Sequence, residues 1–421
     1  MRKSSYTIWD RSLAWLFLVY LLELILTGPI GIVIWDTRIR FVIIFLLFGM
    51  SLVSLVSGKI TNKELKVLTV FSTIFLIWSI LIPIFKNGNL IDAVSEGRSL
   101  FIMFLIIPIS RALLYFGTKF IVNFISYLVG IVAIAVFTCW ICSTYFNNYL
   151  PAELLFNYLD TGIGAGLYIG PMPDGSYRVM FITSIFFPFL ILAKKNSRYF
   201  WGWAGLMMAG VIASGTRAIF IGAIFAIVVI VWNHRKKYLK QPVFYMCIII
   251  GLLYCQFYYD NFSNTRFLDL SDEFDSDSIR LIQLSSLMEL WKNNIIFGAG
   301  FGAVASEVRE GYSYELTYVA LLAKIGIIGM GLLCVLFIVI FANIPTKTAR
   351  FNVFMIGLLF LFVTSTNPYL INLFGLTLLS FLVVLAWNSK ADLSKRSHGS
   401  QISLELPLTG DPDKEPPLMR N

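Results

Sequence analysis

Apolar runs of about 20 residues recur along this chain, and their repetition limits the folds open to it. A helix of that length spans the hydrocarbon core of a bilayer. Of the 421 residues, 58% are hydrophobic and only 14% are charged, whereas a soluble domain carries roughly a quarter charged residues. The sequence therefore predicts an all-α polytopic membrane protein and excludes a soluble globular one.

We predict about twelve transmembrane helices from these runs. Their expected ranges are 12–34, 40–57, 66–85, 99–116, 119–146, 178–193, 198–216, 217–233, 242–258, 316–342, 351–365 and 369–387. Residues 1–258 would then hold helices 1–9, with an outer loop over 147–177. Residues 316–387 would hold helices 10–12. Between them lies a large extracytoplasmic loop, 259–315, and a polar tail over 388–421 is expected to be cytoplasmic and disordered.

The orientation follows from lysines and arginines, which are enriched in cytoplasmic loops. With the N-terminus inside, the basic clusters fall on one side: Lys59, Lys63, Lys66, Lys194, Lys195, Arg198, Arg235, Lys236, Lys237, Lys240, Lys347, Arg350, Lys390, Lys395 and Arg396. Both termini are therefore predicted to be cytoplasmic. We attribute the net charge of +9 to contact with the inner leaflet, not to nucleic-acid binding.

The outer loop over 259–315 has a pattern of its own. Asp275 and Asp277 suit a helix start, and apolar residues recur at helical spacing through 279–291, which predicts an amphipathic helix. The segment FGAGFG, 297–302, is expected to form a flexible turn. It lacks the strand–turn–helix context of a nucleotide site and is predicted to lie outside the cell, so we do not interpret it as a phosphate cradle.

Histidines and cysteines narrow the chemistry of the outer face. The two histidines, His234 and His398, are cytoplasmic in this topology, and all five cysteines fall in predicted spans. The outer loops are therefore expected to have neither a histidine base nor a disulfide framework, and we predict no metal site and no cofactor.

Charged residues at or near the outer ends of spans are the candidates for binding and catalysis. Arg98, Arg178, Arg217 and Arg280 are all predicted at the outer level, where a guanidinium can grip phosphate with two hydrogen bonds. Each could equally extend to lipid headgroups. Glu23 and Lys324 lie within predicted spans, where a charge is expected to face a partner or a cavity.

Four segments resemble motifs of the O-antigen ligase and polymerase superfamily, which comprises membrane glycosyltransferases that use polyprenyl-pyrophosphate-linked glycans. They are ASGTRAIFIG (213–222), SIRLIQLSSLMELWKNNIIFGAGFG (278–302), ELTYVALLAKIGIIG (315–329) and TSTNPYL (364–370). The resemblance implies a GT-C-like, metal-independent glycosyltransferase in a bacterial inner (cytoplasmic) membrane, acting on a polyprenyl-pyrophosphate-linked oligosaccharide. A chain-length regulator protein is a partner that the resemblance allows and the residues do not specify.

One departure from the ligase pattern favours a polymerase. The resemblance implies that ligases carry a histidine at the start of the 315–329 segment, where this chain has Glu315. A carboxylate there can act as general base towards a sugar hydroxyl. Arg217 and Arg280, with Arg178 and Arg98 as weaker candidates, would bind the pyrophosphate. Tyr312, Tyr314 and Tyr318 would stack on sugar rings.

Other interpretations of these residues and of the whole chain stay open. Glu315 could be an acid that stabilises a helix N-terminus, and tyrosines are common at membrane interfaces. The chain could instead be an O-antigen ligase that transfers glycan to lipid A-core, a lipid-linked oligosaccharide flippase or other transporter, or a non-catalytic assembly subunit. The sugars, the linkage, the stereochemical outcome and the oligomeric state are not specified by the residues.

Overall fold

The fold was analysed in a computed structural model, which describes residues 7–27, 33–34, 37–146, 148, 150–151, 167–171, 177–193, 199–214, 217–233, 270–305, 314, 316–342, 347–365 and 372–396. The N-terminal half contains α1 (Ile8–Thr27), β1 (Val33–Ile34), β2 (Thr37–Arg38), α2 (Ile39–Val56), α3 (Asn62–Phe75), the π-helical η1 (Leu76–Leu81), α4 (Ile82–Phe85), α5 (Leu90–Gly97), the 3₁₀ segment η2 (Arg98–Leu105), α6 (Ile106–Phe116) and α7 (Thr118–Phe146). The remainder contains β3 (Leu167–Pro171), β4 (Tyr177–Phe181), η3 (Ile182–Phe186), α9 (Phe187–Ala193), α10 (Phe200–Ser214), α11 (Arg217–Asn233), α14 (Leu270–Lys292), α15 (Thr317–Ala342), α16 (Lys347–Val363) and α17 (Leu373–Arg396).

Helices long and apolar enough to cross a membrane are present, as predicted. Among the described residues five qualify by length and composition: Ile39–Val56, Asn62–Phe85, Leu90–Phe116, Thr118–Phe146 and Thr317–Ile338. Shorter apolar helices cover Thr183–Ala193, Phe200–Ser214, Ala218–Trp232, Phe354–Val363 and Leu373–Trp387. The chain is thus a helical membrane protein. The total of twelve spans stays a prediction, and the expected span over 242–258 lies outside the described residues.

Two short antiparallel hairpins depart from the all-α prediction. β1 pairs with β2, and β3 pairs with β4 so that Gly170 lies opposite Arg178. The predicted span 178–193 is therefore wrong at its start, because Tyr177–Phe181 is a strand and α-helix begins only at Phe187. The reason is local: YRVMF has the aromatic and β-branched residues that favour a paired strand, and Val179 pairs with Ile169.

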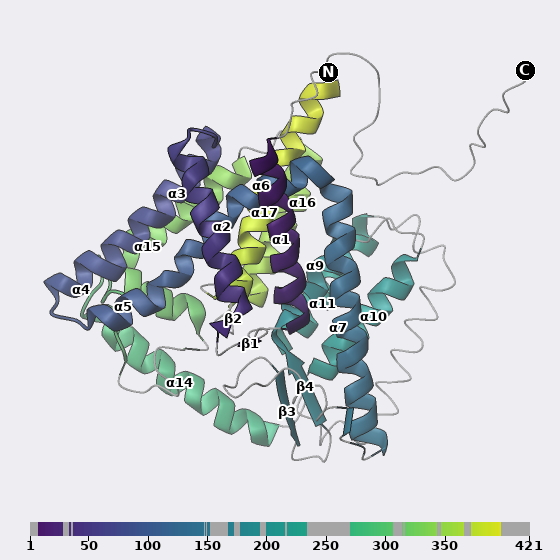
Figure 1. The fold of residues 1–421 in the computed structure, drawn as a ribbon. Helices are drawn as coiled ribbons and strands as arrows, with labels where there is room; N and C mark the ends of the chain where they lie inside the picture. Colours follow the sequence, from purple (N-terminus) through teal and green to yellow (C-terminus); the bar gives the residue numbers. More distant parts are fainter. Residues whose placement is uncertain are drawn as a thin grey trace, which may run out of the picture.

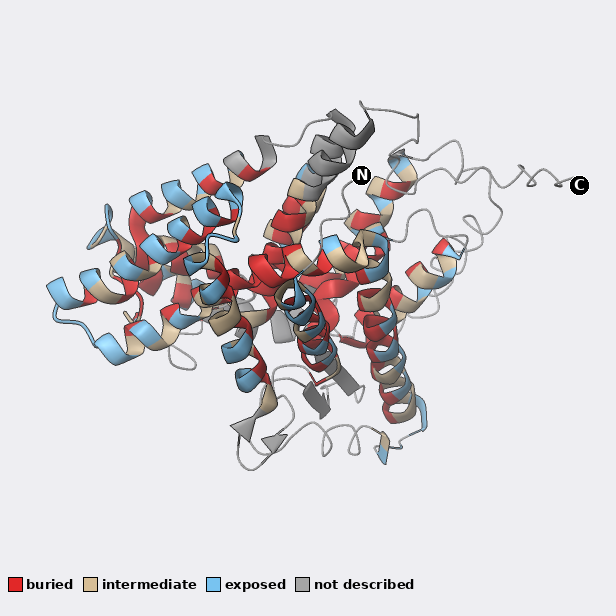
Figure 2. Ribbon diagram, turned by 45° about the horizontal axis from the view of Figure 1, so that its top comes forward, coloured by how far each residue is buried: buried red, intermediate tan, exposed pale blue. Residues whose placement is uncertain are grey.

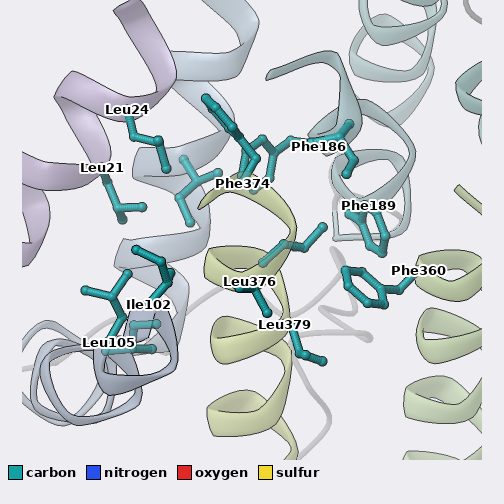
Figure 3. Close-up of a cluster of buried hydrophobic side chains, with 14 of the residues drawn as sticks. Leu21, Leu24, Ile102, Leu105, Phe186, Phe189, Phe360, Phe374, Leu376 and Leu379 are labelled. Atoms are coloured by element: carbon teal, nitrogen blue, oxygen red, sulfur yellow. The ribbon is translucent and has the colours of Figure 1, made fainter. Parts of the chain in front are cut away.

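Many residues on the outer surface of the helices are exposed (pale blue in Figure 2), and large apolar residues are among them. Phe45 is 74% exposed and Ile338 is 65% exposed, and both lie on helices of spanning length. Such exposure would be costly in water over so many residues, whereas lipid tails accept it. The buried side chains gather towards the middle of the molecule, where α17 packs against η2 and α6. Figure 3 shows Leu376 and Leu379 of α17 between Phe360 and Phe189 on one side and Leu105 on the other.

A cluster of charged side chains joins α1, α3 and α6 at one end of the molecule. Arg111 of α6 contacts Asp10 of α1 (3.3 Å) and Glu64 of α3 (3.6 Å), and donates to the carbonyl of Lys59 (2.5 Å). Thr61 caps α3 in a reciprocal capping box with Glu64. α14, β3 and β4 lie at the opposite end of the molecule, away from the start of α1 and the end of α17 (Figure 1).

Two expectations for segments outside the spans can be compared with the structure. The predicted disordered tail over 388–421 is wrong at its start, because α17 continues as helix to Arg396; residues 397–421 lie outside the described part of the chain. A helix is present where an amphipathic one was predicted over 279–291, and it is longer, Leu270–Lys292, but its apolar residues do not all lie on the buried side. Its protein-facing side holds Gln283 and Leu287, while Leu281 and Ile282 face outward. Its position at an outer membrane surface stays a prediction.

Glu23 has the partner that a charge within a span requires. Its carboxylate accepts from Arg40 Nε at 2.6 Å and from Arg40 Nη2 at 3.1 Å, and Arg40 also donates to Thr27. Both charged side chains are almost fully buried. Nearby, the Tyr20 hydroxyl forms a 2.8 Å hydrogen bond with Thr377 and so links α1 to α17.

Candidate functional site

The helix α15 is interrupted at Gly326, which has φ 64° and ψ −171°. A break of this kind leaves the last carbonyls of the first half and the first amides of the second half without helical partners. In a membrane such groups have no water to bind, so protein groups must satisfy them. The residues that follow α14 supply those groups.

The segment 294–302, which we call the glycine turn, runs along the break. Two of its amides donate to the first half of α15, and two of its carbonyls accept from the second half. The four hydrogen bonds are Ala299 N to Ala323 O (2.9 Å), Gly300 N to Lys324 O (2.8 Å), Ile327 N to Ile295 O (3.0 Å) and Ile328 N to Ile296 O (3.1 Å). The break and the turn therefore form one backbone unit, and the turn predicted at 297–302 is present and is held by these hydrogen bonds.

Close backbone approach explains the glycines of this unit. Gly298, Gly302 and Gly326 all have positive φ. A Cβ on Gly298 would lie 2.2 Å from the Lys324 carbonyl oxygen, and one on Gly302 would lie 2.5 Å from the Ala93 amide nitrogen. Gly298 and Gly302 are thus required by packing against α15 and α5.

The glycine turn also forms hydrogen bonds with η1 and with Lys86, which follows α4. Trp78 Nε1 donates to the Phe297 carbonyl at 2.5 Å, and the Phe301 amide donates back to the Trp78 carbonyl at 2.8 Å. Lys86 Nζ donates to the Gly298 carbonyl at 2.7 Å and contacts the Asn294 side chain. Burial lowers the pKa of Lys86. The π-helical stretch of η1 therefore places Trp78 where both its side chain and its backbone bind the turn.

A buried ion pair lies at the centre of this arrangement. Lys324 Nζ contacts Glu96 Oε1 at 2.5 Å, with the two side chains 1% and 12% exposed. Glu96 Oε2 accepts from the Gly302 amide at 2.7 Å. Lys324 thus has a partner, as expected for a charge within a span. Sequence reasoning singled out Lys324 and missed Glu96, whose only signal was its place at the end of a short polar segment before the span over 99–116.

Tyr314 packs on this pair. The Lys324 ammonium lies 5.1 Å from the centre of the Tyr314 ring, and the Tyr314 hydroxyl accepts from the Ala305 amide at 2.7 Å. Burial raises the pKa of Tyr314. The residue is 2% exposed, so its ring has no free face for a sugar. The prediction that Tyr314 stacks on glycan is therefore not supported; its ring packs against Lys324 and Leu287.

The other candidate residues on this stretch lie at or near the start of α15. Tyr312 and Glu315 fall outside the described residues, on either side of Tyr314 and before the start of α15 at Thr317. Tyr318 is half-buried, and its hydroxyl donates to the Leu361 carbonyl (2.7 Å) and bonds Thr364 (2.9 Å). Tyr318 thereby fixes the first turn of α15 against the end of α16.

The start of α11 lies beside the same end of α16. Gly222 packs so closely there that an added Cβ would lie 2.7 Å from Val363 Cγ2. Arg217 begins α11 five residues earlier, about 7.5 Å along the helix. The starts of α11 and α15, which carry Arg217 and Tyr318, therefore both border the end of α16.

The remaining arginines lie on separate elements. Arg280 is on α14, seven residues before Leu287, which packs on Tyr314, Ala320 and Ala323. Arg178 is on β4, opposite Gly170. Arg98 begins η2 directly after α5, is exposed, and is two residues from Glu96. The glycine turn joins the elements that carry Arg98 and Arg280, whereas Arg178 belongs to a different hairpin.

No group of three histidine, cysteine, aspartate or glutamate side chains that could hold a metal ion occurs in the part of the chain that the structure describes.

Comparison with known families bears on the same stretch of chain. A sequence model of the family described as O-antigen ligase matches residues 203–320, which contain α10 from Trp203 onward, α11, α14, the glycine turn and the start of α15. The match covers less than a third of the chain and shows that this part is similar to the O-antigen ligase family; it does not separate polymerase from ligase. The search of curated proteins gives no match.

Proposed function

We propose that this protein is a polysaccharide polymerase that joins lipid-linked oligosaccharide repeat units at the outer face of a bacterial inner membrane. A hydroxyl at the non-reducing end of one repeat unit attacks the anomeric carbon of a growing glycan carried on polyprenyl pyrophosphate. A new glycosidic C–O bond forms, the bond from the anomeric carbon to the pyrophosphate oxygen breaks, and polyprenyl pyrophosphate leaves with the bonding electrons. The hydroxyl proton passes to a base on the protein.

The observation that carries this proposal is the extent of the family match. Residues 203–320 contain Arg217, Arg280 and Glu315, the residues proposed for pyrophosphate binding and proton removal. The fold supports the grouping, because the starts of α11 and α15 border the end of α16 and α14 packs on the first turns of α15. Arg217 and Arg280 thus belong to elements near the start of α15, and Glu315 precedes that start by two residues in the sequence.

Each residue type suits one part of the reaction. The Glu315 carboxylate would take the proton of the attacking hydroxyl, a contribution of about 10²–10⁴ in rate for a positioned base. Arg217 and Arg280 would stabilise the negative charge that develops on the departing pyrophosphate, often the largest electrostatic contribution. Arg98 and Arg178 are the weaker candidates for binding the same pyrophosphate, and Tyr312 and Tyr318 would contact sugar rings. This assignment requires neither a metal ion nor a cofactor.

The polymerase is preferred to the ligase because of Glu315. The family resemblance implies a histidine at this place in ligases, and the two histidines of this chain, His234 and His398, fall in segments predicted to be cytoplasmic. A carboxylate and an imidazole can both remove a proton. As bases, the first is negatively charged and the second is neutral, so they suit acceptors with different electrostatic surroundings. The choice therefore depends on one residue and can be tested at that residue.

The test is the surface polysaccharide of a strain that lacks the native gene. The strain is complemented at matched protein levels with wild type, Glu315→Gln, Arg280→Ala or Arg280→Lys, and the polysaccharide is separated on a gel. We expect a ladder from wild type, single repeat units from Glu315→Gln and Arg280→Ala, and a weak ladder from Arg280→Lys, which keeps the charge but not the two-pronged geometry.

Two results would contradict the proposal. A full ladder from Glu315→Gln would mean that Glu315 is not the base. Loss of even single-unit glycan from the surface in the deletion strain, with accumulation of lipid-linked units, would identify a ligase or a flippase instead.

A further inference from the structure

We propose that Glu96 and Lys324 are positioning residues for the reaction: their buried ion pair holds the end of α5 before Arg98, the helix α14 with Arg280, and Tyr314 at the start of α15 in one fixed arrangement. The catalytic part of this inference rests on the proposed function. Its structural part, that the pair fixes these segments relative to one another, can be tested without the reaction.

Burying this ion pair costs free energy of desolvation, which a contact between neutral side chains would not. Removing two charges from water costs several kcal/mol per ion, and apolar residues of similar volume often stabilise a fold better. Charges within membrane spans are correspondingly rare and usually serve a function. Here both side chains are nearly buried, and Glu96 uses its second oxygen to bind the Gly302 amide at 2.7 Å. The carboxylate thus connects α5, α15 and the glycine turn at a single point.

The first segment fixed by the pair is the end of α5. Glu96 is followed by Gly97, where a Cβ would lie only 1.9 Å from Ser79 Oγ, so α5 packs directly on η1 at this residue. Arg98 comes next and begins η2 with an exposed side chain. A shift of Glu96 would therefore be passed to Arg98 over two residues of tightly packed backbone.

The second segment is α14 with the glycine turn. Glu96 binds Gly302 at one end of the turn, and the Lys324 carbonyl accepts from Gly300 at 2.8 Å. The turn continues backward into the end of α14 at Lys292, and α14 packs through Leu287 on α15. The orientation of α14, and with it Arg280, thus depends on a turn that the Glu96 carboxylate holds at Gly302, while the bond from Gly300 to Lys324 is made by backbone atoms.

The third segment is the start of α15. Lys324 lies 5.1 Å from the centre of the Tyr314 ring, and this ring is fixed at its other end by the Ala305 amide. Glu315 is the next residue along the chain. The lysine therefore holds Tyr314, the residue that precedes Glu315 in the sequence, by a cation–π contact that a neutral side chain cannot make.

The test uses the purified full-length chain in lipid vesicles. The variants are Lys324→Met, Lys324→Arg and Glu96→Gln, and the control is Arg111→Met, which removes a charge-paired arginine at the opposite end of the helices. Per folded molecule, we expect Lys324→Met and Glu96→Gln to lower kcat at least about tenfold, as misplaced catalytic groups do. KM should change less than about threefold, because substrate binding is shared among many contacts. Lys324→Arg should recover most of kcat, and Arg111→Met should leave it near wild type.

A second readout follows the arrangement itself. Spin labels are placed at Ile91 on α5 and Leu281 on α14, both exposed, in a chain whose five cysteines are replaced by serine. We expect the label-to-label distance distribution to broaden in Lys324→Met and Glu96→Gln and to stay narrow in Lys324→Arg and Arg111→Met.

The outcomes separate this inference from the proposed function. If the wild-type chain joins no repeat units but the distances broaden as expected, the proposed function fails and the structural role of the pair stands. If the distances keep their wild-type distribution in Glu96→Gln, or if Lys324→Met keeps full kcat, the positioning role is refuted. If Lys324→Met does not accumulate in the membrane, Glu96→Gln alone decides the test. This variant is expected to fold, because the glutamine side-chain carbonyl can still accept a hydrogen bond from the Gly302 amide.

Discussion

Replacing Gly326 by alanine tests whether the break in α15 and the glycine turn are one unit. The backbone at Gly326 (φ 64°, ψ −171°) lies in a region that only glycine occupies readily. The added Cβ would also lie 2.4 Å from both the Gly298 amide nitrogen and the Ile296 carbonyl oxygen. Because both neighbours are backbone atoms, the turn must move away from the helix if the substitution is to be accommodated.

The expected loss of stability can be worked from these contacts. Backbone strain costs about 1–3 kcal/mol for a residue in such a region. Displacing the turn breaks the four hydrogen bonds across the break, each worth about 1 kcal/mol net. We therefore expect Gly326→Ala to lower the free energy of unfolding by about 5–7 kcal/mol if all four bonds are lost, and by less if the helix regains continuity.

The assay is unfolding of the purified chain in mixed micelles, followed by tryptophan fluorescence, together with amide hydrogen exchange at Ala299 and Ile327. Gly331→Ala is the matched control on the same helix, since nothing lies within 4 Å of its added Cβ. It should be neutral or stabilising by up to about 1 kcal/mol. If Gly326→Ala is no less stable than Gly331→Ala, or if amide exchange at Ala299 does not accelerate, the turn does not support the break and our description is wrong.

Three further predictions concern single contacts. Trp78→Phe should cost about 1–3 kcal/mol, because it leaves the Phe297 carbonyl without its donor; unfolding in mixed micelles measures the loss, and Trp15→Phe, at an exposed position, is the control. Tyr314→Phe should cost only about 0.5–1.5 kcal/mol, because the ring stays packed and only the bond from Ala305 is lost; a drop in activity beyond that in the folded fraction would show that the hydroxyl has another role. Glu23→Gln should cost about 3–5 kcal/mol by leaving Arg40 buried without its counter-charge; an unchanged amount of folded protein in the membrane would exclude a structural role for this pair.

The helical part of the fold could be predicted from sequence because spanning helices satisfy their own backbone. Apolar length alone identified the helices from Ile39 to Phe146 and the one that begins at Thr317. The hairpin of β3 and β4 was missed because the residues of the strand Tyr177–Phe181 lead directly into an apolar run, and we predicted both as one spanning helix. Strand pairing depends on a partner segment, Leu167–Pro171, that precedes it by several residues.

The candidate site was predicted only in outline. Lys324 was recognised because a charge within a span needs a partner, but its partner Glu96 is 228 residues away in sequence and has no local signal. The packing of Gly298 against the break at Gly326 could not be predicted, because the two glycines belong to different segments of the chain. Tyr314 was misassigned because an aromatic residue beside a membrane helix gives no indication of which way its ring faces.

The most direct test of the central claim is a reaction with defined components. The purified chain is reconstituted in vesicles with one polyprenyl-pyrophosphate-linked repeat unit as both donor and acceptor, without lipid A-core, and the products are separated by size. We predict a ladder of lipid-linked oligomers and one polyprenyl pyrophosphate released per bond formed, with neither from Glu315→Gln. If no oligomers form until lipid A-core is added, and single units are then transferred to it, the chain is a ligase and Glu315 does not mark a polymerase.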